Sequence, residues 1–466
     1  MSLELMQKYQ KFSVVTQSPR PCIEIIDNET KLSFKIDSAG KSVLQSYSYT
    51  LSTDNVNGNF SITLYPDSAL FDRLKPFQVV KIYEDKNDNK SPSFVGIIHK
   101  KRFVSQSGQG IKRRVVISGT SSAALVADMK INLSFRASAI TKSYVDAEQL
   151  NLKLTNQTNK NKTLSDVINT VWDFAVGCSK EYVKLSSVKI LEYIQTLLGS
   201  SEEFFDCQNI EIKYPISNIL SGGDTNSFWD IISNVIPEPP YEKFAYMAEN
   251  GKMKIKIREL PFDSDVWNKL DTIAIKSHLL KDVEIEQSDS EVYTAFFAYL
   301  QGAAVTQDFA LVLAGQKAGG APQFHYSTQK FSKYGYRPLE VCFYGYGQKE
   351  DNQKDNSGKD TDVMAAMSER LQKWYENIDT MYQGQITLAT DLSEKVENRC
   401  FVGKKIGLLR GEFYVTSETH SWNYGGNPET KLTITRGGLY QNGQYAELKN
   451  VTDKLSEIIV TKGENE

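Results

Sequence analysis

The sequence is poor in histidine, the residue that most often serves metal and proton-transfer chemistry. Its four histidines, His99, His278, His325 and His420, are spread over 466 residues. None lies in an HExxH motif or at ligand spacing from a cysteine, and no GxSxG segment is present. We therefore expect neither a zinc hydrolase nor a serine hydrolase, and the sequence predicts no catalytic, cofactor-binding or metal-binding residue.

Cysteine is also scarce. The chain has five, at positions 22, 178, 207, 342 and 400, and no CxxC pair. This spacing excludes a zinc ribbon and gives no disulfide framework. We expect five reduced and mostly buried thiols, which fits assembly in a reducing cytoplasm.

Long hydrophobic runs are absent as well. The N-terminal segment MSLELMQKYQKF has no apolar core, so we expect no signal peptide. The most apolar stretch, residues 292–315, is interrupted by Gln301, Gln307 and Asp308. A membrane span needs about 20 apolar residues. We therefore expect a buried strand, a loop and a second buried segment here.

Neither sign of charge is in large excess. The 54 basic and 57 acidic residues give a net charge of −3, which argues against a dedicated nucleic-acid binder. Residues 99–116 are a local exception, with six lysines and arginines and no acid. We favour a solvated hairpin tip for this segment. A basic patch facing nucleic acid or an acidic partner stays open as an alternative.

Two short segments imitate ligand-binding loops. DSAGKS, residues 37–42, has the end of a phosphate loop, but Lys35 replaces the first glycine and strand patterns flank both sides. DNQKDNSGKDTD, residues 351–362, matches a calcium loop only in composition, because Lys359 or Asn356 falls where a ligand or the glycine is required. We predict solvated turns. A pair of glycosidase carboxylates is not marked by sequence spacing, so that alternative stays open.

The element pattern predicts a mainly β chain with α+β insertions: two related β-barrel domains flank a mixed α/β middle module. Alternating apolar residues between Gly, Asn, Asp and Pro turns predict strands at both ends of the chain. The predicted parts are a first barrel over 1–140, the middle module over 141–268, a second barrel over 269–440 with an insertion at about 310–385, and a C-terminal helix or tail over 441–466.

Several elements are predicted individually. Apolar residues at helical spacing indicate helices over 164–176, 187–199, 226–236 and 362–384, the last ending by Gly384. A shorter capped helix is predicted within 118–131. Residues 242–262 read as a hairpin that turns around Glu249-Asn250-Gly251.

Two hairpin-like stretches at opposite ends of the chain are similar. FVGIIHKKRFVSQSGQGIKRRVVISGT begins at Phe94, and FYVTSETHSWNYGGNPETKLTITRGG begins at Phe413. Each opens with an aromatic residue, has a histidine soon after, crosses a glycine-containing turn and returns along an alternating strand. Structural hairpins are duplicated more readily than catalytic clusters are. The pair therefore indicates two related β domains.

The second stretch gathers polar residues that could suggest a catalytic cluster. On the hairpin interpretation they have structural roles. Trp422 and Tyr424 are expected to pack, and Glu412, Glu418 and His420 are expected to form a polar face.

Four stretches together resemble the baseplate hub proteins of contractile phage tails and related contractile injection systems, the late control protein D-like family. They are NGNFSITLYPDSALFDRLKPFQVVKIYED with SFVGII; SFWDIISNVIPEPPYEKFAYMAENGKMKIKIRELPF; KYGYRPLEV; and RCFVGKKIGLLRGEFYVTSETHSW with TKLTITRG. They span nearly the whole chain. Two departures are that no hydrolase segment of the kind some relatives carry is visible and that the C-terminal tail has no counterpart.

The resemblance implies a structural protein without enzymatic activity or cofactor. It implies a homotrimer whose six similar barrels adapt a six-fold tail tube to a three-fold central spike around a channel. The implied partners are the spike, a tail tube or tube-initiator protein and other baseplate proteins, with transient passage of DNA allowed and no stable membrane insertion. The implied location is a virion or injection-particle baseplate assembled in the host bacterial cytoplasm. The alternatives are a tail-associated peptidoglycan hydrolase and a carbohydrate- or receptor-binding tail protein.

Overall fold

The structure is a computed structural model of the 466-residue chain. The residues that it describes are 20–26, 31–35, 43–65, 68–85, 91–106, 112–128, 130–132, 162–169, 172, 201–207, 211–212, 225–236, 238–300, 323–343, 357–392, 394, 396–408, 411–441 and 444–446. Several predicted segments therefore lie wholly or partly outside the description: the loop 37–42, the second half of the helix 164–176 apart from residue 172, the helix 187–199, residues 301–315 of the apolar stretch, residues 351–356 and the tail beyond residue 446.

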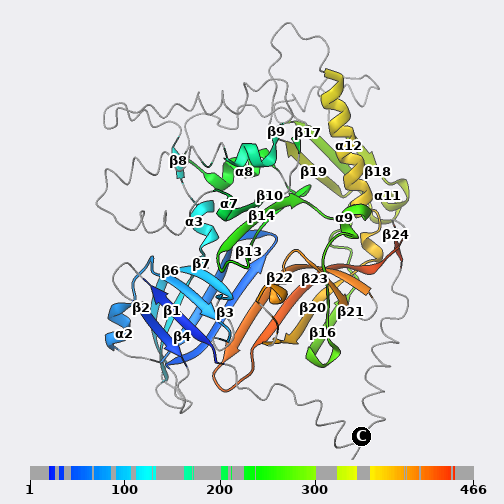
Figure 1. The fold of residues 1–466 in the computed structure, drawn as a ribbon. Coiled ribbons are helices and arrows are strands. Elements are labelled where there is room, and N and C mark those ends of the chain that lie inside the picture. The colour runs from blue at the N-terminus through cyan, green and yellow to red at the C-terminus, as the bar shows by residue number, and fades with distance from the viewer. Residues whose placement is uncertain are drawn as a thin grey trace, which may run out of the picture.

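One fourteen-stranded sheet dominates the molecule (Figure 1). Its hydrogen-bonded order is β16 (Leu280–Glu286), β20 (Tyr382–Ala389), β23 (Glu429–Gln441), β22 (Gly411–Asn423), β3 (Leu44–Ser52), β4 (Asn55–Leu64), β7 (Lys112–Ser121), β6 (Phe94–Gln106), β5 (Val79–Tyr83), β1 (Cys22–Ile26) and β2 (Lys31–Lys35). Three further strands pair off this path: β15 (Thr272–Ala274), β21 (Lys405–Leu408) and β24 (Gln444–Ala446).

Alternation along the strands explains the sheet. In β3, Tyr47, Tyr49 and Leu51 are buried, while the serines and threonines between them are partly exposed. Side chains of a strand point alternately to opposite faces, so this pattern gives one apolar face and one hydroxyl-rich face. The apolar faces of the strands form the main core.

The predicted mainly β class, with helices inserted, is confirmed. The closed barrels are not: the described strands form open sheets. The reason is visible at β3, which pairs with β22 from the other end of the chain instead of closing on a strand of its own half.

The middle part contains a small sheet of β10 (Phe205–Cys207), β14 (Met253–Glu259) and β13 (Tyr241–Met247). The predicted hairpin is β13–β14. Helix α8 (Phe228–Val235) begins at a capping box, in which Asp230 N–H donates to Ser227 Oγ at 3.0 Å and Ser227 N–H donates to Asp230 Oδ2 at 2.8 Å. The remaining short elements are α7 (Ser201–Phe204), α9 (Ser264–Trp267), the pair β8 (Lys130–Asn132) with β12 (Thr225–Ser227), and the pair β9 (Lys162–Thr163) with β11 (Glu211–Ile212).

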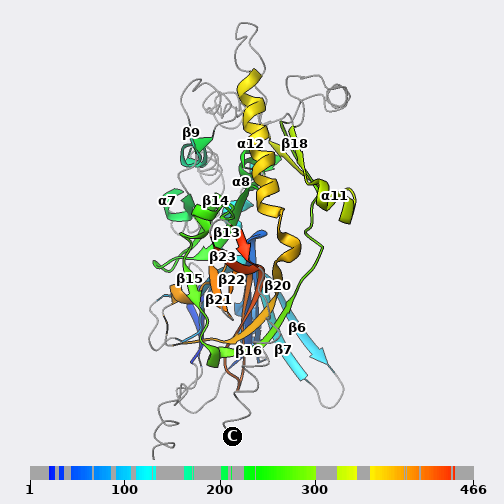
Figure 2. The ribbon, with the colours of Figure 1, turned by 90° about the vertical axis from the view of Figure 1, so that its right-hand side faces the viewer.

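A second insertion follows β16. It has a sheet in the order β18 (Gln323–Tyr326), β17 (Ala295–Leu300) and β19 (Pro338–Phe343), with α12 (Ser357–Tyr375) packed on β17 and β18. The other helices are α2 (Ser68–Arg73), α3 (Ala123–Ala127), α11 (Thr328–Tyr334), η2 (Ser277–Leu279), η3 (Ile378–Thr380) and η4 (Val396–Arg399). In both ribbon views this insertion and the middle part gather at one end of the large sheet (Figures 1 and 2).

Two helix predictions need correction. Helix α12 ends at Tyr375, and Gly384 lies in β20 with a φ of +156°, a backbone conformation that residues with a side chain rarely adopt. A Cβ there would lie 1.9 Å from the carbonyl oxygen of Glu284, so the glycine serves close strand packing and not a helix end. Helix α3 has Ser122 at its N-cap, but the serine side chain makes no capping hydrogen bond. No helix of the described residues is long and apolar enough to cross a membrane.

Candidate functional site

The large sheet contains two copies of one four-stranded arrangement. We call β3, β4, β7 and β6 the first unit, and β16, β20, β23 and β22 the second unit; each set is hydrogen-bonded in that order. The first two strands of each unit share an irregularity. In β3 the register with β4 shifts between Leu44 and Ser46. In β16 the register with β20 shifts between Leu280 and Asp282. In both cases the shift directly follows the first residue pair of the two strands.

A second irregularity also coincides. The β6–β7 register shifts between Ile98 and Lys100, and the β22–β23 register shifts between Val415 and Ser417. The β4–β7 and β20–β23 pairings give the same correspondence. The residues of β7 and β23 that face these shifts pair with equivalent residues of β4 and β20. β-Bulges are specific features of a strand pair, so two matching bulges in matching strands indicate a structural duplication.

The two units thus share a backbone pattern, and their alignment differs from the one that the sequence suggests. When the two units are aligned on their bulges, Phe94 is equivalent to Gly411. That position lies two residues before Phe413. Sequence similarity between the two hairpins suggests instead that Phe94 is equivalent to Phe413. Backbone hydrogen bonds decide the true correspondence.

The two units meet where β22 pairs antiparallel with β3, and we call this pairing the seam. It joins Ser417–Asn423 to Ser46–Ser52 in continuous register. On one face of the seam the side chains are small and hydroxyl-bearing, and Thr50 Oγ1 lies 2.9 Å from Thr419 Oγ1. The two units are thereby one continuous sheet.

The opposite face of the seam is aromatic and buried. Tyr49 and His420 stack with ring centroids 4.7 Å apart and an interplanar angle of 6°. Beside them, Tyr47 and Trp422 stack at 6.0 Å. Cross-strand aromatic pairs stabilise a sheet by about 0.2–1 kcal/mol each relative to a pair of alanines.

Under these rings lies a buried charge cluster, which consists of Glu84, Arg399, Glu418 and His420. Glu84 accepts three hydrogen bonds or ion pairs: from Tyr49 Oη at 2.8 Å, from His420 Nδ1 at 2.8 Å and from Arg399 Nη1 at 2.6 Å. The cluster joins the segment after β5 to η4 and β22. It therefore ties the two units together on the core side of the seam.

Opposite charges set the protonation of this cluster. Burial by itself would raise the pKa of Glu84, but the charges of His420 and Arg399 and the Tyr49 hydroxyl outweigh it and lower that pKa to about 2. Burial likewise would lower the pKa of His420, yet Glu84 and Glu418 raise it to about 9. Both groups are charged at neutral pH, so the cluster contains true ion pairs.

With this geometry established, the chain can be compared with known proteins. No family model and no curated protein matches it. Solved structures do. A 43 kDa tail protein of prophage MuSo2 from Shewanella oneidensis aligns at TM-score 0.47 and 11% identity, covering 90% of this chain and 98% of that one. A tail protein from Neisseria meningitidis aligns at TM-score 0.46 and 9% identity, covering 90% and 97%.

A third similar structure is a type VI secretion system component from E. coli, described as similar to bacteriophage T4 tail proteins. It aligns at TM-score 0.37 and 9% identity, covering 91% of this chain and 78% of that one. The similar structures are thus tail and secretion-system components, the class that the sequence resemblance named. Because the TM-scores lie below 0.5, this likeness assigns neither a partner nor an activity to this chain.

The expected polar face of β22 is wrong. Glu418, His420 and Trp422 lie at every second position and all face the core, with Glu418 1% exposed and His420 2% exposed. Glu418 accepts hydrogen bonds from the backbone N–H groups of Phe401 and Val402. Tyr424 was expected to pack; it contacts Trp422 edge-on but is 47% exposed.

Glu412, the third member of the expected polar face, lies on the other part of β22. It accepts hydrogen bonds from Trp267 Nε1 and Lys405 Nζ, each at 3.0 Å. It therefore holds α9 to the second unit. The hairpin interpretation stands, because β22 and β23 pair antiparallel and the two carboxylates and the histidine do not come together in an open site.

The other histidines lie apart from one another. His99 is exposed and its Nε2 lies 2.7 Å from Thr120 Oγ1, while His325 Nδ1 lies 2.7 Å from Ser368 Oγ. His278 lies in η2 and is exposed. Within the described ranges, no group of three His, Cys, Asp or Glu side chains could hold a metal ion. Of the calcium-like segment, residues 357–362 open α12 and the preceding six lie outside the described residues.

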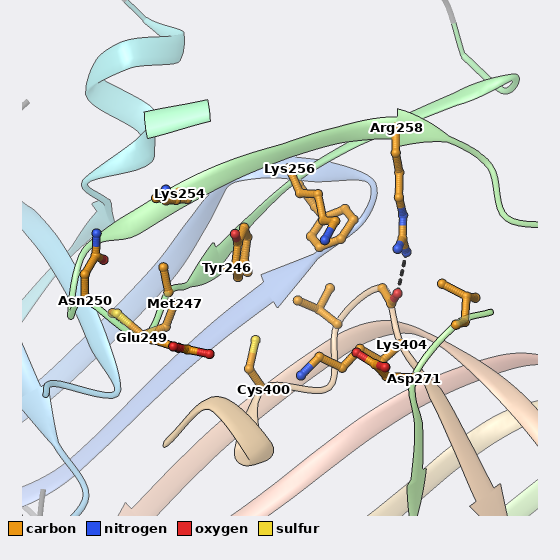
Figure 3. Close-up of a pocket in the computed structure, with 15 residues that line it drawn as sticks. Tyr246, Met247, Glu249, Asn250, Lys254, Lys256, Arg258, Asp271, Cys400 and Lys404 are labelled. Carbon is orange, nitrogen blue, oxygen red and sulfur yellow. Dashed lines mark hydrogen bonds between the residues drawn. The ribbon is translucent and has the colours of Figure 1, made fainter. Parts of the chain in front are cut away.

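A cavity of about 490 Å³ lies between the β13–β14 hairpin and the loop before β21 (Figure 3). Lys254, Lys256 and Arg258 of β14 extend along one wall, and Arg258 donates to the carbonyl of Gly403 on the opposite side. Lys256 is paired with Asp206 at 3.2 Å. The cavity therefore separates the middle part from the second unit, with Arg258 bridging the two.

One potential nucleophile lines this cavity, the thiol of Cys400. Burial, with a further contribution from the charge of Glu418, raises its pKa far above the ordinary value. A thiol is nucleophilic only as the thiolate, so Cys400 is inert at neutral pH.

Proposed function

We propose that this chain is a structural baseplate hub of a phage tail or contractile injection system. In this proposal it forms a trimeric ring that adapts a six-fold tail tube to a three-fold central spike and encloses a channel. The observation that carries the proposal is the register-matched pair of units joined by the seam. One chain thereby presents two near-equivalent building blocks side by side.

Two units per chain resolve a mismatch of symmetry. Three copies of such a chain supply six similar units, so the same ring can meet a six-fold partner with its units and a three-fold partner with its whole chains. Closed rotational symmetry is the usual way in which identical chains bury their sheet edges. The arithmetic needs no substrate and no cofactor.

The face of the sheet away from the core suits a channel wall. On β3, β4 and β22, and at Ser118 of β7, it carries uncharged, mostly hydroxyl-bearing side chains: Ser46, Ser48, Thr50, Ser52, Asn59, Ser61, Thr63, Ser118, Ser417, Thr419 and Ser421; the neighbouring β23 adds Glu429 and Lys431 to the same face. Passing DNA binds tightly where lysines and arginines neutralise its phosphates. The hydroxyl-lined strip around the seam would be wetted without retaining nucleic acid.

The finer assignments follow from this arrangement. We assign the first barrel domain to residues 1–140, the second to 269–440 with its insertion at about 310–385, and contact with the spike to the middle module, 141–268. The tail tube or tube initiator and other baseplate proteins complete the set of partners. The location is a virion or injection-particle baseplate, assembled in the host bacterial cytoplasm without stable insertion in a membrane. The tail 441–466 begins with β24 against β23.

We also propose that the chain is not an enzyme. A glycosidase needs a carboxyl group whose pKa is raised, so that it can donate a proton at neutral pH. Burial acts in that direction, but hydrogen bonds and nearby cations prevail at each described carboxyl whose pKa departs from its ordinary value. All are lowered: Glu84, Asp206, Glu369 and Asp379.

Light scattering on the purified chain, alone and mixed with its cognate spike protein, tests the proposal. We expect a trimer, or a monomer that becomes a three-to-three complex when the spike is added. A monomer that stays unchanged in the presence of the spike would contradict the hub assignment. Assays on peptidoglycan and on glycans would then decide between the hydrolase and receptor-binding alternatives.

A further inference from the structure

Among the described strands, two unpaired stretches of the large sheet face away from each other: the outer half of β6, and the outer edge of β16; beyond β5 and β1 the sheet ends at β2. On the outer side of β6, strand β5 pairs only with Phe94–Ile97, and further backbone bonds reach Ile98. Beyond that point, the only described partner of β6 is β7. At the other end of the sheet, β16 pairs with β20 alone among the described strands. The two edges lie on opposite sides of the molecule (Figure 1), and the β6–β7 hairpin extends away from the body in the side view (Figure 2).

The seam shows how such edges are filled. In the second unit, β21 pairs with Gly411–Tyr414 of β22, and the rest of that strand pairs with β3. In the first unit, β6 is the counterpart of β22, and β5 is the counterpart of β21. The strand that would complete β6 is therefore the counterpart of β3, which is β16.

Because the chain's own β16 lies at the far edge, it must come from another molecule. We propose that the outer half of β6 pairs antiparallel with β16 of a neighbouring copy of this chain, in the register of the seam. This inference rests on the proposed function for its ring of copies. It adds to that function the surface and the residues through which the copies join.

The matching bulges set the register. Because Ser417 corresponds to Lys100 and Ser46 to Asp282, the seam pairs convert directly. The resulting pairs, with the neighbouring copy's residue second, are Lys100–Ser288, Lys101–Gln287, Arg102–Glu286, Phe103–Ile285, Val104–Glu284, Ser105–Val283 and Gln106–Asp282.

This register brings opposite charges together. Lys100 and Arg102 of β6 are exposed, and so are Asp282, Glu284 and Glu286 of β16. They share the face that carries Thr50 and Thr419 at the seam. Arg102 and Glu286 take the positions of those two threonines. Opposite charges directly across a strand pair stabilise it, and like charges destabilise it. A second copy shifted by one residue would lose this match.

The same register covers an exposed aromatic side chain. Phe103 is 51% exposed, and on its own chain its ring contacts Phe71 edge-on at 6.4 Å. It occupies the position that His420 has at the seam, and Ile285 occupies that of Tyr49. Pairing would therefore lay Phe103 against Ile285 on the core side. Edge strands with exposed apolar residues are aggregation sites unless a partner covers them.

The two edges differ, so the contact is head-to-tail. Such a contact produces a closed ring if the rotation per copy divides a full turn, and an open filament otherwise. A ring built this way alternates two kinds of junction. The seam lies within each chain, and the β6–β16 junction lies between chains.

Cysteine cross-linking in the full-length chain tests the register. Arg102→Cys with Glu286→Cys places thiols on directly opposed positions, within the Cα separation of about 4.4–6.8 Å that a disulfide needs. We expect covalent multimers after mild oxidation. The matched control, Arg102→Cys with Gln287→Cys, puts the second thiol on the other face and should stay unlinked. Each single variant controls for the native cysteines.

Charge reversal gives an independent measurement. Arg102→Glu should raise the concentration at half-assembly by about tenfold or more, and adding Glu286→Arg should restore most of the loss. The control is Arg113→Glu, an exposed charge on β7 outside the proposed register, which should leave assembly unchanged.

The outcomes separate this inference from the hub assignment. Cross-linking only in the proposed register, together with charge-swap rescue, would support the junction. A trimer by mass that shows neither result would overturn the junction and leave the hub assignment standing. A monomer that does not bind the spike but forms the in-register cross-link would contradict the hub assignment and leave the junction standing.

Discussion

Tyr49 and His420 stack almost parallel across the seam, with ring centroids 4.7 Å apart. The same histidine also forms an ion pair, with its Nδ1 2.8 Å from Glu84 Oε1. One side chain thus contributes to both the packing and the electrostatics that hold the two units together. The seam is therefore sensitive to pH in a direction that can be worked out.

His420 should make stability fall at alkaline pH. Its pKa is about 9 in the folded protein, above the ordinary 6.5. A pKa that is raised by folding stabilises the folded protein. This stabilisation is complete below pH 6.5 and is lost as the pH rises through 9. The difference between the two pKa values corresponds to about 3 kcal/mol of folding free energy. Urea unfolding at pH 6 and pH 9.5 measures it. His420→Gln should be less stable at pH 6 and should show a flatter decline. An unchanged slope would contradict this role.

Glu84 gives the complementary acid limb. Its pKa of about 2, below the ordinary 4.5, provides stability that is present above 4.5 and is lost as pH falls toward 2. Glu84→Gln should cost about 3–5 kcal/mol at pH 7, because Arg399 would lose its buried ion-pair partner and His420 would keep only the more distant Glu418, at 4.0 Å. The matched control is Glu429→Gln, which breaks the exposed pair with Lys281 and should cost about 1 kcal/mol or less. Equal losses in thermal unfolding would refute the argument.

Gly119 should tolerate no side chain. A Cβ there would lie 1.8 Å from the carbonyl oxygen of Ile97 and 2.9 Å from the ring of Phe60. Gly119→Ala should therefore destabilise the first unit by about 1–3 kcal/mol or more, through displacement of β6. Gly407, in β21, has only ordinary contacts at 3.7 Å, so Gly407→Ala should be close to neutral. Urea midpoints of the two variants give the comparison.

Cys400 should be chemically silent until the protein unfolds. It is buried, and burial together with Glu418 raises the pKa of its thiol. Labelling with a chromogenic disulfide at pH 8 should modify it only in denaturant. A Cys400→Ser variant should show the same number of fast-reacting thiols as the parent in native buffer. One fast thiol fewer would show that the cavity admits reagents and leaves Cys400 reactive.

Local patterns were enough to predict much of this fold. The alternating strands at both ends, the β13–β14 hairpin and the helix α8 have the positions that periodicity and turn residues indicate. These elements are set by residues close in sequence. The predicted end of α12 failed because the close approach of Gly384 to the β16 backbone is a tertiary constraint, which a glycine letter does not distinguish from a helix cap.

The seam and its charge cluster were not predicted. No local pattern indicates that β3 pairs with β22, since the two strands are hundreds of residues apart. The inward orientation of Glu418 and His420 did have a signal. They alternate in step with Trp422, and a tryptophan expected to pack carries its every-second neighbours to the same face. The charge of Glu418 and His420, taken alone, instead suggests that they face solvent.

The distance along the chain between the seam strands has a consequence for synthesis. Thr50 and Thr419, which touch at 2.9 Å, are separated by 369 positions. On a ribosome that adds about 5–20 residues per second, β3 emerges many seconds before β22 exists. Its outer edge must stay uncovered for that interval, and contacts of such high sequence separation form slowly even in the complete chain. The nascent first half thus presents an exposed strand edge, the kind of surface whose aggregation chaperones limit.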